Sequence, residues 1–214
     1  ERKAEQLEEQ FSMCTVDPPR FEWIATRRFA TFLSHYKVEC AADARFLHDS
    51  LRKMLRCPIY LDSSTLSDLR HLFDNGLLQS DTLVLLASKG VLTRPWCQLE
   101  LLYAKRNGIP IVPLFIQGSA LCVEEMRGYV QNLSSELSEY NLKLVREWVG
   151  KGEDITELQD VLNEVLDLLE KSADCARWNS SAGHLEMCAD LKKLVSQMAV
   201  CTGRAVIFTE KPAP

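Results

Sequence analysis

Three side chains at helical spacing in the middle of the sequence could do chemistry together. Trp96, Glu100 and Tyr103 are four and three residues apart, and this spacing places them on one face of a helix. Thr93-Arg94-Pro95 predicts the start of that helix, because proline is tolerated in the first turn. The positive end of the helix dipole favours the charged form of Glu100, so we expect an anionic carboxylate. Such a group beside an indole ring suits a reaction that develops positive charge on a ribose ring.

The segments around this helix alternate between strand and helix patterns. We expect strands at 29–34, 58–62, 82–88 and 109–116, with amphipathic helices between them. Residues 82–88, TLVLLAS, are almost wholly apolar, which is typical of a strand covered on both faces. This order predicts a doubly wound parallel sheet with right-handed crossovers.

The pattern is weaker after Gly118. Residues 122–144 read as an interrupted helix and 155–169 as an amphipathic helix, and we expect a fifth strand between these two without a pattern that places it. Further on, residues 185–199 indicate a helix and 205–209 a strand.

Polar residues follow the first three strands. In an open α/β sheet, ligands gather at the carboxyl ends of the strands, and this rule selects 34–37, 62–65 and 88–96. His35 could be a general base or a loop-packing residue. Trp96 could be a ligand platform or a core anchor, and Cys97 is interpreted as a small buried residue because no His/Asp arrangement activates it. Ser63 and Ser64 fit a polar turn as well as a ribose contact.

The composition is that of an ordinary globular chain. A net charge of -5 without a Lys/Arg run argues against binding of nucleic acid or an anionic membrane. The eight cysteines form no C-x-x-C pair and have no histidine at zinc-ligand spacing, so we expect reduced thiols, no metal site and a cytoplasmic location. No apolar run approaches the length of a membrane span, and the charged opening at 1–10 reads as a helix entered midway in a longer protein.

Five motifs in order carry a family resemblance. FLSHYKVE (32–39), YLDSSTL (60–66), GLLQSDTLVLLAS (76–88), WCQLEL (96–101) and PIVPLFIQG (110–118) resemble the segments of the TIR (Toll/interleukin-1 receptor) domain, with WCQLEL matching its W-C-x-x-E-L motif. The similarity covers about residues 28–170 and is greatest to plant-type, NAD+-cleaving members.

The resemblance implies a fold and a domain organisation. We expect an α/β, flavodoxin-like, doubly wound parallel five-stranded sheet with flanking helical extensions. Residues 1–27 would form an N-terminal helical linker, 28–170 the TIR domain, and 171–214 a C-terminal extension with a helix and a short strand.

The resemblance also implies an activity. The enzymatic branch of the family cleaves the nicotinamide–ribose bond of NAD+ to give nicotinamide and ADP-ribose or a cyclic isomer, as an oligomer held by TIR–TIR contacts, in immune or stress signalling. NAD+ is the substrate and no cofactor or metal is required. Glu100 matches the catalytic glutamate, and the residues expected to surround the substrate are Ser34, His35, Tyr36, Lys37, Asp62, Ser63, Ser64, Trp96 and Cys97.

Two departures and two rival interpretations accompany this hypothesis. Enzymatic relatives often have an arginine shortly after the first strand, where this chain has His35, Tyr36 and Lys37, and Lys37 would replace it only as a point charge. The loop after the second strand, called the BB loop, has Leu66 where a glycine is usual. The W-C-x-x-E-L motif also occurs in TIR domains that signal by contact alone, so the alternative is a non-catalytic scaffold. A phospho-receiver domain is the weaker rival, because paired acids after the first strand are lacking.

Overall fold

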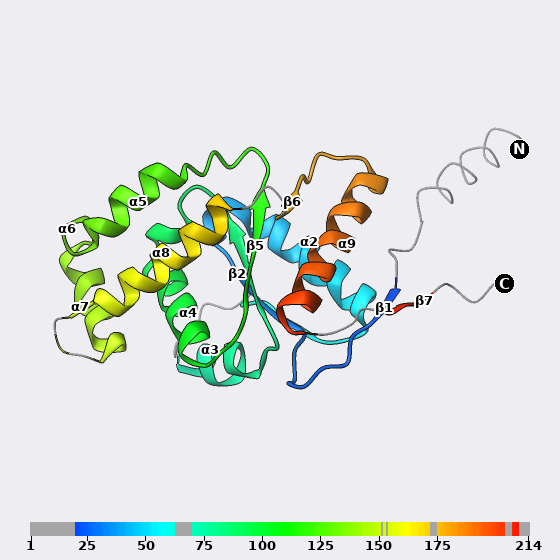
Figure 1. Cartoon of the computed structure of the whole chain (residues 1–214), viewed down its shortest axis with the longest axis horizontal. Coiled ribbons are helices and arrows are strands. Elements are labelled where there is room, and N and C mark those ends of the chain that lie inside the picture. Colours follow the sequence, from blue (N-terminus) through cyan, green and yellow to red (C-terminus); the bar gives the residue numbers. More distant parts are fainter. Residues whose placement is uncertain are drawn as a thin grey trace, which may run out of the picture.

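Two β-sheets with helices packed on them make up the described part of the protein (Figure 1). The computed structural model describes residues 20–62, 70–150, 152, 154–171, 175–203 and 207–209. The central sheet has five strands in the order β3-β2-β4-β5-β6, and all of its pairs are parallel. Their bounds are β2 Thr31–Ser34, β3 Ile59–Tyr60, β4 Leu83–Ala87, β5 Ile111–Ile116 and β6 Ala176–Trp178. The order of a flavodoxin-like, doubly wound fold is thereby confirmed.

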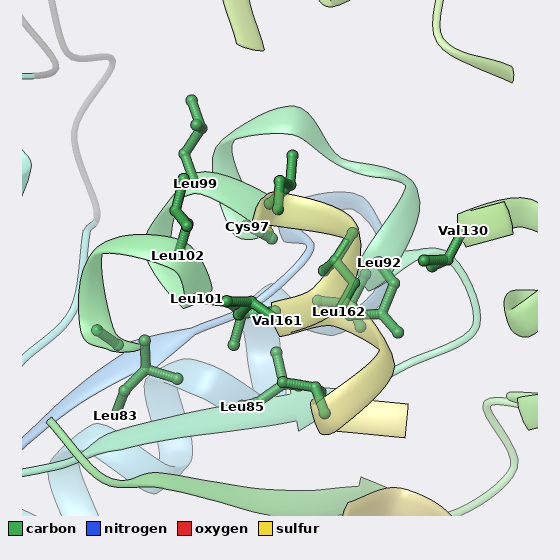
Figure 2. Packing of buried hydrophobic residues seen from close by; sticks show 14 of the residues in the cluster. Leu83, Leu85, Leu92, Cys97, Leu99, Leu101, Leu102, Val130, Val161 and Leu162 are labelled. Carbon is green, nitrogen blue, oxygen red and sulfur yellow. The ribbon is translucent and has the colours of Figure 1, made fainter. Parts of the chain in front are cut away.

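Strand β4 shows why this sheet is covered on both faces. All five of its residues are buried, and successive side chains point to opposite faces of a strand. Leu83, Leu85 and Ala87 belong to one buried apolar cluster, and Val84 and Leu86 to the other. Figure 2 shows Leu83 and Leu85 facing leucine and valine side chains of the helices that cover the first of these clusters.

Helices cover each face of the sheet in separate layers (Figure 1). On one face lie α2 (Lys37–Leu55) and α9 (His184–Cys201). On the other lie α4 (Pro95–Arg106) and α8 (Thr156–Glu170). The same side also holds α5 (Val123–Gln131), α6 (Leu133–Glu136) and α7 (Glu139–Val149). Short segments complete the crossovers: α3 (Arg70–Asn75), η1 (Leu77–Gln79) and η2 (Val91–Thr93).

Helix α4 begins where the sequence indicated and ends at Arg106. Pro95 occupies its first position, and Asn107 follows its last residue. Gly108 has a φ of +62°, a left-handed conformation that glycine adopts without steric cost. The helix therefore presents its residues at a fixed register to the carboxyl edge of the sheet.

The fifth strand does not lie where it was expected. It was expected between the helices at 122–144 and 155–169, but it follows them as β6 and pairs with β5, with Leu114 opposite Ala176 and Ile116 opposite Trp178. Only three residues long, with exposed Arg177 between two buried neighbours, it is too short for the sequence pattern to reveal. The segment expected to be a C-terminal extension thus supplies both an edge strand and helix α9.

The residues before β2, the first strand of the central sheet, also pack onto the domain. Strand β1 (Arg20–Glu22) pairs antiparallel with β7 (Ile207–Thr209), and Phe21 and Trp23 are buried. Residues 20–27 of the expected helical linker are therefore part of the packed structure, whereas the helix expected before them lies outside the described residues. Within the described part of the chain, no helix has the length and apolar character needed to cross a membrane.

Asp81 fastens this N-terminal segment. Its side chain is buried and accepts hydrogen bonds from Trp23 Nε1 at 3.1 Å, from the backbone N–H of Thr26 at 3.2 Å and Arg27 at 3.1 Å, and from Thr26 Oγ1 at 2.6 Å. Hydrogen bonds to a charged acceptor are among the stronger ones. One carboxylate therefore fixes the path of the chain into β2.

We predict that Asp81→Ala lowers the free energy of unfolding by about 2 to 4 kcal/mol, because one buried donor, Trp23 Nε1, and three part-buried donors lose their acceptor. Urea denaturation followed by circular dichroism measures the change. Asp49→Ala is the matched control, since Asp49 lies on the solvent-facing side of α2, and it should change stability by less than about 0.5 kcal/mol. Equal effects of the two substitutions would contradict this role for Asp81.

Candidate functional site

A hydrogen bond between Ser34 and Glu100 lies at the centre of the candidate site. Ser34 is the last residue of β2 and is 1% exposed, and Glu100 lies on α4 and is 7% exposed. The Ser34 hydroxyl donates to Glu100 Oε2 at 2.5 Å. Because Ser34 lies opposite Leu85 of β4 in the parallel register, this bond is at the carboxyl edge of the sheet, where ligands of doubly wound folds bind.

The charge of Glu100 differs from the expectation. Burial raises the pKa of the Glu100 carboxyl to about 8; the Ser34 hydrogen bond lowers it, the Asp62 charge raises it, and the Lys37 charge lowers it. Glu100 is therefore mostly a neutral acid at pH 7, and the expectation of an anion was wrong. A helix dipole contributes about 0.3–1 kcal/mol, less than one pKa unit, whereas burial can shift a carboxyl by several units.

Lys37 and Asp62 join two of the loops that were expected to meet. Lys37 Nζ lies 3.0 Å from Asp62 Oδ2, which ties the start of α2 to the end of β3. The Lys37 side chain is about half exposed, so the pair adds little stability. Its consequence is electrostatic, because the lysine charge at this edge is largely compensated by a carboxylate.

The Cys97 side chain packs against the backbone of His35, and the two side chains form no catalytic pair. The Cys97 thiol lies 3.6 Å from the backbone carbonyl oxygen of His35, and burial raises the pKa of this thiol well above its usual range. Burial also lowers the pKa of His35, whose Nδ1 lies 3.4 Å from the Leu33 carbonyl oxygen. A neutral imidazole and a protonated thiol fit the loop-packing and small-buried-residue interpretations.

Trp96 and Tyr103 take part in an aromatic cluster. The Trp96 ring meets Trp148 of α7 edge-on, with centroids 5.7 Å apart, and the Tyr103 ring stacks on Phe73 at 4.5 Å. Trp96 is partly buried, so one part of its ring anchors α4 against α7. Trp148 and Phe73 were not singled out in the sequence, since partners this far apart along the chain leave no local pattern.

Two contacts at this edge were not predicted from the sequence, although Arg94 lies in the selected range 88–96. Glu39 accepts hydrogen bonds from Ser88 Oγ at 2.6 Å and from the Gly90 backbone N–H at 2.9 Å. The Arg94 guanidinium lies over the Tyr36 ring, 4.1 Å from its centroid. Both contacts join the loop after β2 to the loop after β4, two segments that the sequence had selected separately.

Part of the predicted site belongs to the loop after β3. Ser63 and Ser64, together with Leu66 of the BB loop, lie outside the described residues. Among the residues that are described, no group of three or more His, Cys, Asp and Glu side chains could hold a metal ion. The described site thus comprises Ser34–Lys37, Asp62, Trp96, Cys97 and Glu100, with Glu39 and Arg94 added.

Comparison with known proteins identifies the family. The family model described as TIR domain matches residues 31–148, more than half of the chain. The protein belongs to the TIR domain family. A solved structure, the TIR domains of the activated Roq1 resistosome directly recognizing the pathogen effector XopQ, is similar with a TM-score of 0.53 and 15% identity, covering 78% of this chain and 98% of that one. At this identity the likeness shows the fold. No curated protein matches the chain.

The raised pKa of Glu100 makes the stability of this TIR domain depend on pH. The pKa is about 8 in the folded protein and has a reference value of 4.5. Between these values the folded state holds one more proton than the unfolded state, so folding stability falls as pH rises from about 4.5 to about 8. Glu100→Gln removes this loss because the amide does not titrate.

We compare the free energy of unfolding of Glu100→Gln with that of the unmodified protein. We predict that the difference shifts in favour of Glu100→Gln by about 4 kcal/mol as pH rises from 5 to 8.5, at 1.36 kcal/mol per pKa unit. Denaturation of both proteins at several pH values measures the difference. Glu164→Gln, which alters an exposed side chain of α8, is the control and should show no such trend. A Glu100→Gln difference that stays constant with pH would argue against a raised pKa.

Proposed function

We propose that this TIR domain cleaves NAD+ to nicotinamide and ADP-ribose or a cyclic isomer, with Glu100 as the catalytic residue. The observation that carries the proposal is the Ser34–Glu100 hydrogen bond, which holds a glutamate of the W-C-x-x-E-L motif at the carboxyl edge of the sheet. Membership of the TIR family, in which one branch has this activity, supports it.

The high pKa of Glu100 fits a cationic substrate. The nicotinamide ring of NAD+ is positively charged, and a positive charge beside a buried carboxyl favours its ionised form. Bound NAD+ would thus generate the carboxylate that it needs. The anion then accepts hydrogen bonds from the ribose hydroxyls and stabilises the positive charge that develops on the sugar. The Ser34 hydroxyl remains a hydrogen-bond donor to the ionised side chain.

The bond changes balance without any cofactor. The C1′–N bond of the ribose breaks, and its electron pair leaves with nicotinamide, which becomes neutral. The oxygen of a water molecule then bonds to C1′, and the water loses a proton to give ADP-ribose. In the cyclising variant, a nucleophilic atom within the same ADP-ribosyl unit takes the place of water.

Self-association completes the proposal. The similar solved structure shows the TIR domains of the activated Roq1 resistosome, which supports an oligomeric active form for this protein. In that form the BB loop of one protomer would help to complete the next protomer's site. Signalling in immunity or stress and a cytoplasmic location follow from the same family relation and are proposed with it.

The structure also offers an observation that favours a second function, that of a non-catalytic TIR scaffold. Glu100 is nearly fully buried, and its carboxyl accepts a hydrogen bond from Ser34 of the same chain. A glutamate held in this way could simply tie α4 to β2. This protein would then recruit other TIR domains by contact, and Glu100 would matter for stability alone.

Nicotinamide release separates the two functions. We predict that the purified protein at high concentration releases nicotinamide from NAD+, and that Glu100→Gln slows release about 10²- to 10³-fold, as expected when a group that stabilises transition-state charge is lost. Chromatography of the reaction mixture measures the product. Glu164→Gln is again the matched control and should retain full activity. No release by the unmodified protein, or equal release by Glu100→Gln, would leave only the scaffold.

A further inference from the structure

We propose that Arg94, held against the ring of Tyr36, binds the diphosphate of the nucleotide at this edge of the sheet. The inference rests on the proposed function, because it takes NAD+ as the ligand. It assigns a phosphate-binding role to a residue that the sequence motifs did not single out.

The position of Arg94 suits this role. It is exposed and directly precedes Pro95, the first residue of α4, six residues before Glu100, or about 9 Å along the axis at 1.5 Å per residue. Burial raises the pKa of the Cys97 thiol and the Arg94 charge opposes that rise, so the guanidinium is within electrostatic reach of Cys97, which precedes Glu100 by three residues on α4. In the proposed arrangement, the diphosphate of a dinucleotide lies at the Arg94 charge when its nicotinamide ribose reaches Glu100.

The stacking on Tyr36 leaves the donors of Arg94 available. The guanidinium carbon is 4.1 Å from the Tyr36 ring centroid, a distance typical of a cation–π contact. A stacked guanidinium uses its flat face, while its N–H groups lie in its own plane and can form two parallel hydrogen bonds to phosphate oxygens. Among the described residues, no carboxylate forms an ion pair with Arg94.

The Tyr36 ring is itself fixed by the loop after β4. A Cβ atom added at Gly90 would lie 3.3 Å from Tyr36 Cε1 and 2.9 Å from Glu39 Oε1, so a larger residue there would displace the Glu39 carboxylate and shift the Tyr36 ring slightly. Glu39 holds the loop through Ser88 Oγ and the Gly90 N–H. The platform for Arg94 is therefore formed before any ligand arrives, which reduces the entropy lost on binding.

The other charges at this edge leave Arg94 as the best-suited cation. Lys37 is paired with Asp62 at 3.0 Å, and burial keeps the pKa of His35 low. Lys89 is an exposed point charge in the same loop as Gly90. The carboxylate of Glu39 would oppose an anion, but it already accepts hydrogen bonds from Ser88 and Gly90.

Binding of ADP, measured by isothermal titration calorimetry on the full chain, tests the proposal. ADP carries the diphosphate but lacks nicotinamide, so its binding does not depend on turnover. We expect Arg94→Ala to weaken ADP binding about 10- to 100-fold, the effect of losing charge-assisted hydrogen bonds. Arg94→Lys, which keeps the charge but not the paired donors, should weaken it about 3- to 10-fold.

Matched variants separate this site from general electrostatics. Lys89→Ala removes one positive charge from the neighbouring loop and should change ADP binding by less than about threefold. Tyr36→Leu removes the aromatic ring beneath Arg94 and should bind ADP about as weakly as Arg94→Ala. Equal losses in Lys89→Ala and Arg94→Ala, or no ADP binding by the unmodified protein, would overturn the proposal.

Nicotinamide release tells the two proposals apart. If Arg94→Ala raises KM for NAD+ while Glu100→Gln lowers kcat, both stand. If ADP binds through Arg94 but NAD+ is not cleaved, the catalytic proposal fails and the phosphate site remains. If NAD+ is cleaved and Arg94→Ala alters neither KM nor ADP affinity, the assignment of Arg94 is wrong and the catalytic proposal stands.

Discussion

Burial of one carboxyl group against one hydroxyl determines the character of this site. Ser34 ends a strand that is buried along its whole length, and Glu100 faces it from α4 at 2.5 Å. Neither partner could be moved without shifting the register of β2 against β4 or the start of α4, which Pro95 fixes. The geometry of the site is thus a consequence of the core packing on both sides of the sheet.

The same burial decides the charge of the site before a ligand binds. A neutral Glu100 costs far less to bury than a carboxylate without a partner, and the nearby opposite charges, Lys37 and Asp62, largely compensate each other. The resting site therefore carries little net charge around Glu100. A ligand with a cationic ring at one end and a diphosphate at the other would place the ring beside Glu100, which it would ionise, and the diphosphate beside the guanidinium of Arg94. The two ends of this site would then carry opposite charges.

Strong local patterns made much of the fold predictable. The apolar run of β4 and the proline at the start of α4 are local signals, and the structure has both elements there. Strand β6 was misplaced because three residues with an exposed arginine in the middle carry no periodic signal. Its position in the sheet is fixed by pairing with β5 and by packing of α9, and both are contacts between distant parts of the chain.

Several residues of the candidate site could be selected from the sequence, but the charge of Glu100 and the contact of Arg94 could not. The rule that ligands bind at the carboxyl ends of strands selected Ser34, Lys37 and Asp62, and helical spacing with the W-C-x-x-E-L motif added Glu100. The structure places these four side chains together. The predicted ionisation of Glu100 was wrong because a sequence shows that a residue is near the start of a helix but does not show that it is buried. The contact of Arg94 with Tyr36 was not predicted for a related reason, although Arg94 lies in the selected range 88–96. Tyr36 is 58 positions earlier and no spacing rule connects the two.

The pKa of the Glu100 carboxyl, read from its side-chain ¹³C resonance during a pH titration, tests the central claim most directly. Comparison with Glu100→Gln assigns the resonance, and a second titration with a non-cleavable NAD+ analogue reports the effect of the cationic ring. The predicted result is a midpoint near 8 in the free protein and a lower midpoint with the analogue bound. A midpoint at the ordinary glutamate value of about 4.3, or one that the analogue raises, would contradict it.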